Sequence, residues 1–315
     1  MKKISIVTGC YNEEENVALL VETVRKIMTE RLTGYRYEHI FIDNASEDRT
    51  VEILRSIAAE DKHVKVIVNS RNFGHVRSPM YAMLDADGDA VILLVADFQD
   101  PPEMIKEFVA KWEEGYDTVL AIKAQSQENS MMYRLRELYY GMLHKLSEVP
   151  VFKNFTGFGL YDRKVMDAMR RMRDPYPFLR GMVAEVGYKV ARIPYDQPVR
   201  LHGVTKNNFY SLYDMGMLGI INNSKIPLRL AIFVGSFMGV VSFFVGFGYL
   251  IAKLIYWDEM NMGMAPLLII ATFSFSILLF FIGILGEYVG MIYTQVLDRP
   301  LVFEKERINF DRTDH

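Results

Sequence analysis

The chain has 315 residues and a formal net charge of -3, so it is long enough for one sizeable domain plus a smaller unit. This charge does not supply the strongly basic face that nucleic-acid binding requires, so a nucleic acid is excluded as the expected partner. The one cysteine, Cys10, excludes an intramolecular disulfide and fits a reducing compartment.

Residues 1 to about 125 alternate between strand-like and helix-like patterns. Short apolar runs closed by turn residues predict buried strands, and apolar residues at helical spacing predict amphipathic helices. This alternation predicts an α/β fold with a mostly parallel sheet and helices on both faces. The expected strands are 4–9, 39–43, 64–69, 91–96 and 117–122, and the expected helices are 14–28, 50–59, 76–84 and 102–114.

Two further segments have the periodicity of amphipathic helices. Apolar residues recur at helical spacing between positions 130 and 147, and the opposite face carries Arg134. Residues 209–221 repeat the pattern just before a long apolar run, so this helix is expected to lie in a membrane interface. A soluble helix packed on the domain is the alternative.

Two long apolar segments lie near the C-terminus. Residues 230–252 and 265–286 contain no charged residue. At about 1.5 Å per residue, each segment can span the roughly 30 Å hydrocarbon core of a bilayer. The short linker between them carries Asp258 and Glu259, so we predict a transmembrane hairpin. A pair of buried core helices is the alternative.

The basic residues around this hairpin predict its orientation. Lys225 and Arg229 precede it and Arg307 follows it, whereas Lys253 alone borders the linker. By the positive-inside rule, the soluble domain and both termini are expected to be cytoplasmic. The chain would then be a multi-pass protein of a cell inner membrane or plasma membrane.

Polar residues follow four of the predicted strands. Because the carboxyl ends of parallel strands share one edge of a sheet, these side chains can converge on one ligand. Neither GxGxxG nor GxxxxGK[ST] follows the first strand, so a carboxylate-lined nucleotide diphosphate site with a divalent metal fits better. In chain order the residues are Tyr11, Asn12 and Glu13; Asp43, Asn44 and Ser46; Asn69, Arg71, Asn72 and Gly74; and Asp97 and Gln99.

Four segments, SIVTGCYNEEEN, FIDNASEDRT, NFGHVRSPMYAMLDADGDA and ADFQDPPE, resemble the family-2 glycosyltransferases with the Rossmann-like GT-A fold. With the C-terminal hairpin, the whole chain resembles their polyisoprenyl-phosphate glycosyltransferases, relatives of dolichyl-phosphate mannose synthase. The resemblance implies that Asp97, with Gln99, binds Mg²⁺ or Mn²⁺. It also implies that the nucleotide-sugar donor is held by Tyr11, Asn12, Glu13 and Asp43. Three further residues at the strand ends, Asn44, Asn72 and Gly74, are candidates for the same donor site.

These features together divide the chain into four parts. We expect a GT-A catalytic domain over residues 1–206 and a juxtamembrane amphipathic helix over 207–226. A transmembrane hairpin is expected over 227–296, with spans at about 228–254 and 265–287. Residues 297–315 are expected to form a cytoplasmic tail.

The sequence departs from the family pattern at two places. Val95 stands where relatives have the first acid of Asp-x-Asp, and Asp85 and Asp87 are expected in a solvated turn, not a metal site. Relatives often read Gly-Asp-Phe-Arg-Leu where this chain has Gly157 in place of a catalytic Asp and Gly159 in place of the Arg.

Three other polar residues near these motifs are expected to be structural. Asp100 is expected to cap the following helix, and Asp162 to cap a helix that starts near Arg163. His75 is expected to have a packing or hydrogen-bonding role.

The missing acid is compatible with a phosphate acceptor. A lipid phosphate has a second pKa of about 6, so it is already an anionic nucleophile near pH 7 and needs no general base. It needs positive charge instead, for which Arg134, Arg200 and Lys206 are the candidates, with solvated surface charges as the alternative.

The expected enzyme is therefore an inverting, membrane-bound glycosyltransferase. It would move a sugar from a UDP-sugar or similar donor to a polyisoprenyl phosphate such as undecaprenyl phosphate, for cell-surface glycan synthesis. Two alternatives stay open: a non-catalytic membrane scaffold that binds a nucleotide-sugar or a partner, and a glycosyltransferase with a saccharide acceptor. A homo-oligomer is also compatible with the sequence.

Overall fold

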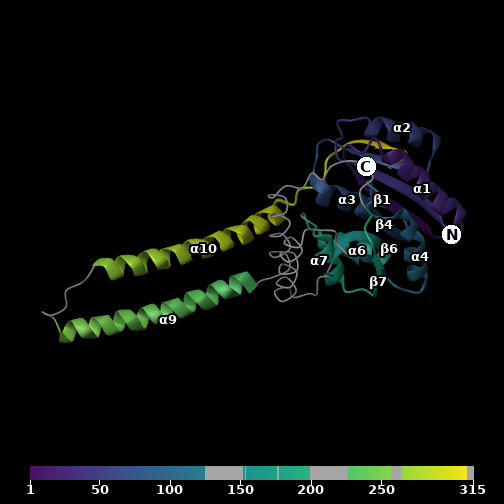
Figure 1. The fold of residues 1–315 in the computed structure, drawn as a ribbon. Coiled ribbons are helices and arrows are strands. Elements are labelled where there is room, and N and C mark those ends of the chain that lie inside the picture. Colours follow the sequence, from purple (N-terminus) through teal and green to yellow (C-terminus); the bar gives the residue numbers. More distant parts are fainter. Residues whose placement is uncertain (125–151, 153, 176, 199–225, 257–263, 311–315) are drawn as a thin grey trace. The chain divides into compact units, whose positions relative to one another are not determined.

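The computed structural model describes residues 1–124, 152, 154–175, 177–198, 226–256 and 264–310. Within them, an eight-stranded sheet has the order β7-β5-β6-β4-β1-β2-β3-β8 (Figure 1). The strands β1 to β4 are parallel neighbours, which confirms the predicted α/β class with a mostly parallel sheet. The bounds are β1 Lys3–Cys10, β2 Arg36–Asp43, β3 Val64–Asn69, β4 Ala90–Val95, β5 Thr118–Lys123, β6 Phe155–Asp162, β7 Val190–Tyr195 and β8 Glu304–Ile308.

Helices cover both faces of the sheet because successive strand side chains point in opposite directions. Ile4 and Ile6 of β1 belong to the core layer formed with α1 (Val17–Glu30), α2 (Thr50–Glu60) and α4 (Ile105–Glu113). Val7 of the same strand belongs to the layer formed with α3 (Gly74–Asp85), α6 (Arg163–Met172) and α7 (Leu179–Val186).

Three strands, β6, β7 and the C-terminal β8, lie outside the predicted alternation. β6 is antiparallel to both of its neighbours, β4 and β5, and β7 runs parallel to β5. β6 contains Gly157 and Gly159, and glycine is depleted in strands because it offers no side chain to pack. Its pairing partners are therefore what make this segment a strand.

The C-terminal segment returns to the sheet as its edge strand. β8 pairs antiparallel with β3, with Ile308 opposite Val66 and Glu304 opposite Asn69. Residues 297–315, predicted from sequence to be a separate tail, thus include part of the main sheet. The sequence of β8, EKERI, contains no apolar run that could have indicated a strand.

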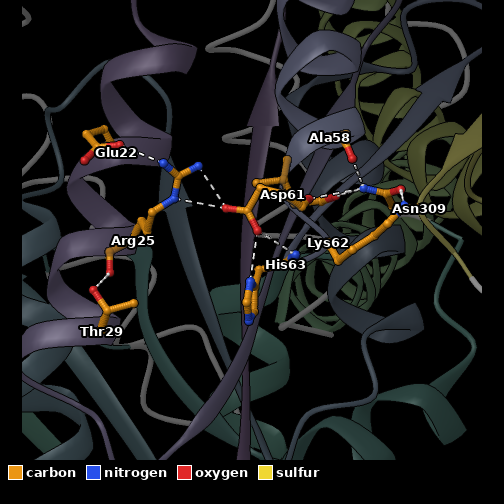
Figure 2. Close-up of polar contacts among 9 residues, drawn as sticks. Glu22, Arg25, Thr29, Ala58, Asp61, Lys62, His63 and Asn309 are labelled. Atoms are coloured by element: carbon orange, nitrogen blue, oxygen red, sulfur yellow. Dashed lines mark hydrogen bonds and ion pairs between the residues drawn. The ribbon is translucent and has the colours of Figure 1, made fainter.

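Asn309 fixes the end of β8 to the turn between α2 and β3 (Figure 2). Its Nδ2 donates to the carbonyl oxygens of Ala58, of Asp61 at 3.2 Å and of Val64 at 2.9 Å. The last carbonyls of a helix lack intrahelical partners, so this side chain satisfies groups at the end of α2. Figure 2 also shows the Asp61 carboxylate accepting a hydrogen bond from Arg25 Nε and forming an ion pair with Arg25 Nη2.

Two long helices, α9 (Ile226–Ile255) and α10 (Met264–Leu297), contact each other and form a second unit. Mean hydropathy is 2.2 over Leu230–Gly248 and 2.1 over Phe273–Leu297, and no part of either window is buried. A core helix of a soluble protein would be mostly buried, and a signal sequence would lie near the N-terminus. The remaining interpretation is that both helices are suited to cross a membrane.

The second apolar helix is longer than predicted. The sequence places the end of the second span near Glu287, but α10 continues to Leu297. It ends where Asp298 adopts a left-handed φ of 43° and Pro300 follows, since proline cannot continue a helix. The predicted helices at 130–147 and 207–226 lie wholly or almost wholly outside the described residues.

Candidate active site

The polar residues predicted to converge do share one edge of the sheet. β1 and β2 are in register with Cys10 opposite Asp43, and β1 and β4 with Gly9 opposite Val95. The loops that follow these strands therefore leave the sheet side by side, and β3 adds the loop after Asn69. Parallel pairing alone produces this convergence.

The first two loops are locked together through Asp43, which is fully buried. Its carboxylate accepts hydrogen bonds from the backbone N–H of Ser46, at 2.9 Å, and from the Ser46 hydroxyl. Ser46 Oγ in turn accepts from the N–H of Asn12 at 2.8 Å, where Asn12 has a left-handed φ of 56°. Burial raises the pKa of Asp43, and the bonds from Ser46 partly oppose this. Asp43 is thus tied to its own loop.

Glu13 is held at the start of α1 by two contacts. Its N–H donates to Thr50 Oγ1 at 2.8 Å, and its carboxylate accepts from Asn16 Nδ2 at 2.6 Å. Tyr11 also lies at this loop and lines the cavity described below. The first loop is therefore rigidly attached to the second, as a binding surface for one face of a ligand requires.

An asparagine network holds the third loop. Asn44 Nδ2 donates to Asn72 Oδ1 at 2.9 Å, and Asn44 Oδ1 accepts from the N–H of Phe73 at 2.8 Å. Asn72 Oδ1 also accepts from the N–H of Gly74, the first residue of α3, at 2.8 Å. Asn69 joins the network by donating to Asn44. Three predicted site residues, Asn44, Asn72 and Gly74, thus fix where α3 begins.

Asp97 follows β4 and is 6% exposed. Its Oδ1 accepts the backbone N–H of Gln99 at 3.1 Å, across Phe98 with a left-handed φ of 59°. Within the part of the chain that the structure describes, no group of three His, Cys, Asp or Glu side chains is placed to hold a metal. Any cation here would need ligands from a substrate in addition to Asp97 and Gln99.

Asp100 does not cap the next helix. The short helix at Pro102–Met104 has no side-chain cap, and Asp100 Oδ1 instead accepts from the hydroxyl of Tyr195 on β7 at 3.0 Å. Burial, the largest cause, and the charge of Asp97 raise the pKa of Asp100 to about 7, although the hydrogen bond from Tyr195 opposes them. The contact with β7 takes the place of the predicted helix cap, and it anchors the loop that carries Asp97.

A cavity of about 330 Å³ opens at this edge between α3, the ends of β1 and β4, and α7. Among the described residues that line it, His75 and Arg180 are the only imidazole and cationic side chains, and none is an acid. Arg180 was not expected as a site residue, because no local pattern indicated the position of α7. The lining residues are Gly9, Cys10, Tyr11, Asn44, Gly74, His75, Val76, Ser78, Pro79, Met80, Met83, Leu93, Leu94, Val95, Thr156, Pro177, Phe178, Leu179 and Arg180.

Cys10 lines this cavity as a structural residue. It is 4% exposed, and burial, the largest cause, together with nearby Asp43 raises the pKa of its thiol. The thiol therefore stays protonated and donates weakly to the carbonyl of Ile42.

Asp85 and Asp87 lie at the opposite edge of the sheet. α3 begins at the cavity with Gly74 and ends at Asp85, whose carboxylate pairs with Arg307 at 2.9 Å. Asp87 pairs with Lys3, the first residue of β1. Both acids therefore serve ion pairs at the amino ends of the strands, away from the cavity.

The two glycines that replace family residues occupy constrained positions in β6. Gly157 has a φ of 112°, and an added Cβ would lie 3.2 Å from Leu93 Cδ2 and 3.3 Å from Leu179 Cδ2. A Cβ on Gly159 would lie 2.3 Å from the backbone oxygen of Val119. An aspartate and an arginine therefore do not fit this backbone.

We expect Gly157→Asp to lower the free energy of unfolding by about 1 to 3 kcal/mol, because only glycine adopts this φ without strain. Gly34→Asp is the matched control, since Gly34 has open space around it. Chemical denaturation of both variants measures the difference. Equal stability of the two variants would contradict the constraint.

Asp162 caps α6 as predicted, with the N–H of Lys164 donating to its Oδ1 at 3.0 Å. The structure adds a second contact, from Trp112 Nε1 to Asp162 Oδ2 at 2.7 Å. Both carboxylate oxygens are thus used structurally. The predicted cationic residues Arg134, Arg200 and Lys206 lie outside the described residues.

The family model described as glycosyl transferase family 2 matches residues 5–173 of the chain. The "Uncharacterized glycosyltransferase YkcC" of Bacillus subtilis is 36% identical over 298 residues, covering 94% of this chain and 91% of that protein. The SfII prophage-derived bactoprenol glucosyl transferase of Shigella flexneri is 33% identical, covering 95% of this chain and 96% of that protein. A solved glucosyl-3-phosphoglycerate synthase from Mycobacterium tuberculosis, with Mg²⁺ and UDP, is 19% identical over 70% of this chain and 77% of its own, with a TM-score of 0.49.

Proposed function

The chain belongs to glycosyl transferase family 2, and we propose that it moves a sugar from a nucleotide diphosphate-sugar to the phosphate of a polyprenol at a membrane. The observation that carries the proposal is near full-length similarity, at 33% identity, to proteins named bactoprenol glucosyl transferases. Two exposed apolar helices in the same chain supply the membrane attachment that a lipid substrate requires.

The donor would lie across the loops after β1, β2 and β3. Tyr11, Asn12 and Glu13 would hold the nucleoside, which we expect to be uridine, whereas Asp43, which is buried and bonded to Ser46, would act by fixing the loops that carry them. Asn44 and Asn72 act by fixing the third loop and the first turn of α3. Because these loops are hydrogen-bonded to one another before the donor arrives, little ordering is needed on binding.

Asp97 and Gln99 fit a divalent metal site that a donor diphosphate completes. Mg²⁺ is usually held by one or two carboxylates plus substrate phosphates, and Asp97 is a buried carboxylate at the sheet edge. When bound, such a cation stabilises the negative charge of the departing nucleotide diphosphate. Asp97 would orient the diphosphate through this site, and the Phe98 turn holds its carboxylate in place.

The acceptor phosphate would attack the anomeric carbon from the face opposite the leaving diphosphate, so the configuration inverts. The new bond joins the phosphate oxygen to the anomeric carbon while the bond to the diphosphate breaks. An ionised phosphate needs no base, which agrees with the backbone at Gly157 that disfavours an acid. A saccharide acceptor would need a base to remove its hydroxyl proton. The scaffold alternative is disfavoured, because the chain is a glycosyltransferase by family.

The test is transfer by the purified full chain. Undecaprenyl phosphate is incubated with a panel of radiolabelled nucleotide-sugars and Mg²⁺ or Mn²⁺, and label is counted in the organic phase. We expect label from one UDP-sugar only, and its loss when undecaprenol replaces the phosphate. Transfer to water-soluble saccharides alone would overturn the proposal.

We also propose that the catalytic domain and both termini are cytoplasmic. β8 pairs with β3, so residues 304–308 must lie on the same side of the membrane as the N-terminal strands. An even number of crossings satisfies this, and α9 and α10 supply two. The basic flanks of the hairpin favour the cytoplasmic side.

We expect a cysteine introduced by Asn261→Cys, in a Cys10→Ser background, to react with an impermeant thiol reagent added to intact cells. Thr313→Cys should react only after the cells are opened. Both positions are compared in the same strain, with the Cys10→Ser protein as the blank. Labelling of Thr313→Cys from outside would reverse the orientation and separate the enzyme from cytoplasmic nucleotide-sugars.

A further inference from the structure

The cavity at the sheet edge has a cationic end and an apolar body. Arg180 and His75 line it together. Burial of the imidazole, the larger cause, and the positive charge of Arg180 both lower the pKa of His75. Part of the His75 side chain is exposed, and solvent there screens both effects. The two side chains, from α7 and α3, are therefore close enough to act on one ligand.

The first turn of α3 adds to this positive end. α3 begins at Gly74 next to His75, runs for 12 residues and has no acid in its first turn. The N-terminus of a helix carries a partial positive charge. A guanidinium carries N–H donors in a fixed plane, and a neutral imidazole carries one more. The negative charge and the acceptor oxygens of a phosphate group match donors of this kind.

The remainder of the lining is mostly hydrocarbon. Met80 and Met83 of α3 contribute, as do Leu93, Phe178 and Leu179. A nucleoside diphosphate would leave many of its polar groups without partners against this surface. An isoprenyl phosphate matches it, because it has one anionic group attached to a branched hydrocarbon chain.

We propose that the cationic end of this cavity, Arg180 with His75, binds the phosphate of the isoprenyl acceptor, with its first isoprene units against the apolar lining. This inference rests on the proposed function for the identity of the acceptor. Val95 lines the cavity and lies two residues before Asp97, so a phosphate bound there approaches the donor from the α7 side. Arg180 is then a substrate-binding residue of the reaction.

The test uses the full chain in lipid nanodiscs and measures equilibrium binding of three probes: farnesyl phosphate, farnesol and UDP. Arg180→Gln should raise the Kd for farnesyl phosphate about tenfold to hundredfold, because a charge-assisted hydrogen bond is lost. The Kd values for farnesol and UDP should stay within about twofold. Arg180→Lys should recover part of the affinity, since it restores the charge without the planar fork.

Arg171→Gln is the matched control, because Arg171 is an exposed arginine of α6 outside the cavity lining. It should leave all three Kd values unchanged. His75→Gln provides a second variant if Arg180→Gln unfolds, since His75 is exposed and its loss should cost about threefold to tenfold.

An unchanged Kd for farnesyl phosphate in a folded Arg180→Gln protein overturns the proposal. A weakened Kd for UDP instead overturns it too, because the cationic end would then serve the donor. Binding that depends on Arg180, in a protein that transfers no sugar to undecaprenyl phosphate, would refute the proposed function and leave this site standing. Sugar transfer by a protein whose binding of farnesyl phosphate does not depend on Arg180 would refute this site and leave the proposed function standing.

Discussion

Asp97→Ala is expected to lower turnover by about 1,000-fold or more while the protein stays folded. A bound cation stabilises charge by several kcal/mol, and each 1.36 kcal/mol corresponds to about tenfold in rate. Asp97 is the buried acid directly after β4, and Val95 stands where the motif usually has its first acid. Its removal also relieves the repulsion that Asp97 exerts on Asp100, so the fold should tolerate the change.

Two measurements check this expectation. Initial rates at saturating Mn²⁺ show whether turnover falls, and Mn²⁺ binding in the presence of UDP shows whether the loss is in the metal site. Asp85→Ala and Asp87→Ala are matched controls, because these acids form ion pairs at the opposite edge of the sheet. They should keep turnover within about threefold, since exposed ion pairs contribute about 0 to 1 kcal/mol to stability. Wild-type turnover in Asp97→Ala would show that the metal site is assigned wrongly.

Deletion of residues 298–315 is expected to destabilise the main domain severely, although both apolar helices remain. The deletion removes β8 and leaves the N–H and C=O groups of β3 without their ladder partners. At about 1 kcal/mol for each of several hydrogen bonds, the loss is on the order of 3 kcal/mol or more. The burial of Val302, which is 4% exposed, is lost as well.

The same segment braces the cavity. Arg77 of α3 donates to the carbonyl of Pro300 at 2.8 Å, and Tyr81 donates to Glu304 at 2.6 Å. Loss of these contacts frees α3, whose first turn lines the cavity, so affinity for farnesyl phosphate should fall together with stability.

Deletion of residues 311–315 alone is the matched control, because it leaves β8 and Asn309 in place. Thermal unfolding in nanodiscs measures both proteins, and limited proteolysis reports on the exposed edge of β3. If the protein that lacks residues 298–315 unfolds at the same temperature as the full chain, β8 is dispensable for stability.

Much of this fold follows from local patterns in the sequence. Periods of 2 and 3.6 residues predicted β1 to β5 and α1 to α4, because side-chain direction along a strand or helix depends only on its own backbone. The two apolar helices followed from length and hydropathy, although the end of α10 did not. The rim of polar residues was predictable too, since parallel strands necessarily place their carboxyl ends together.

Asp162 and Asp100 show which hydrogen bonds the local sequence determines and which ones depend on tertiary contacts. Capping by Asp162 is a contact over two residues, so the sequence predicted it correctly. Asp100 was expected to cap as well, but its partner Tyr195 is 95 residues away. A local hydrogen-bonding preference is worth about 1 kcal/mol, and burial beside a distant strand exceeds it.

The tertiary structure alone decided where the chain's late segments go. β8 has a charged sequence and becomes a strand only because β3 offers an unpaired edge, and Asp85 meets Arg307 across 222 positions. Gly157 reads as a lost catalytic acid in the sequence, whereas its φ of 112° shows a backbone that an acid would strain. Arg180 and His75 likewise come to line one cavity only when the fold has brought α7 and the start of α3 to the same edge of the sheet. Such pairings depend on which distant surfaces bury each other, and a local pattern carries no information about that choice.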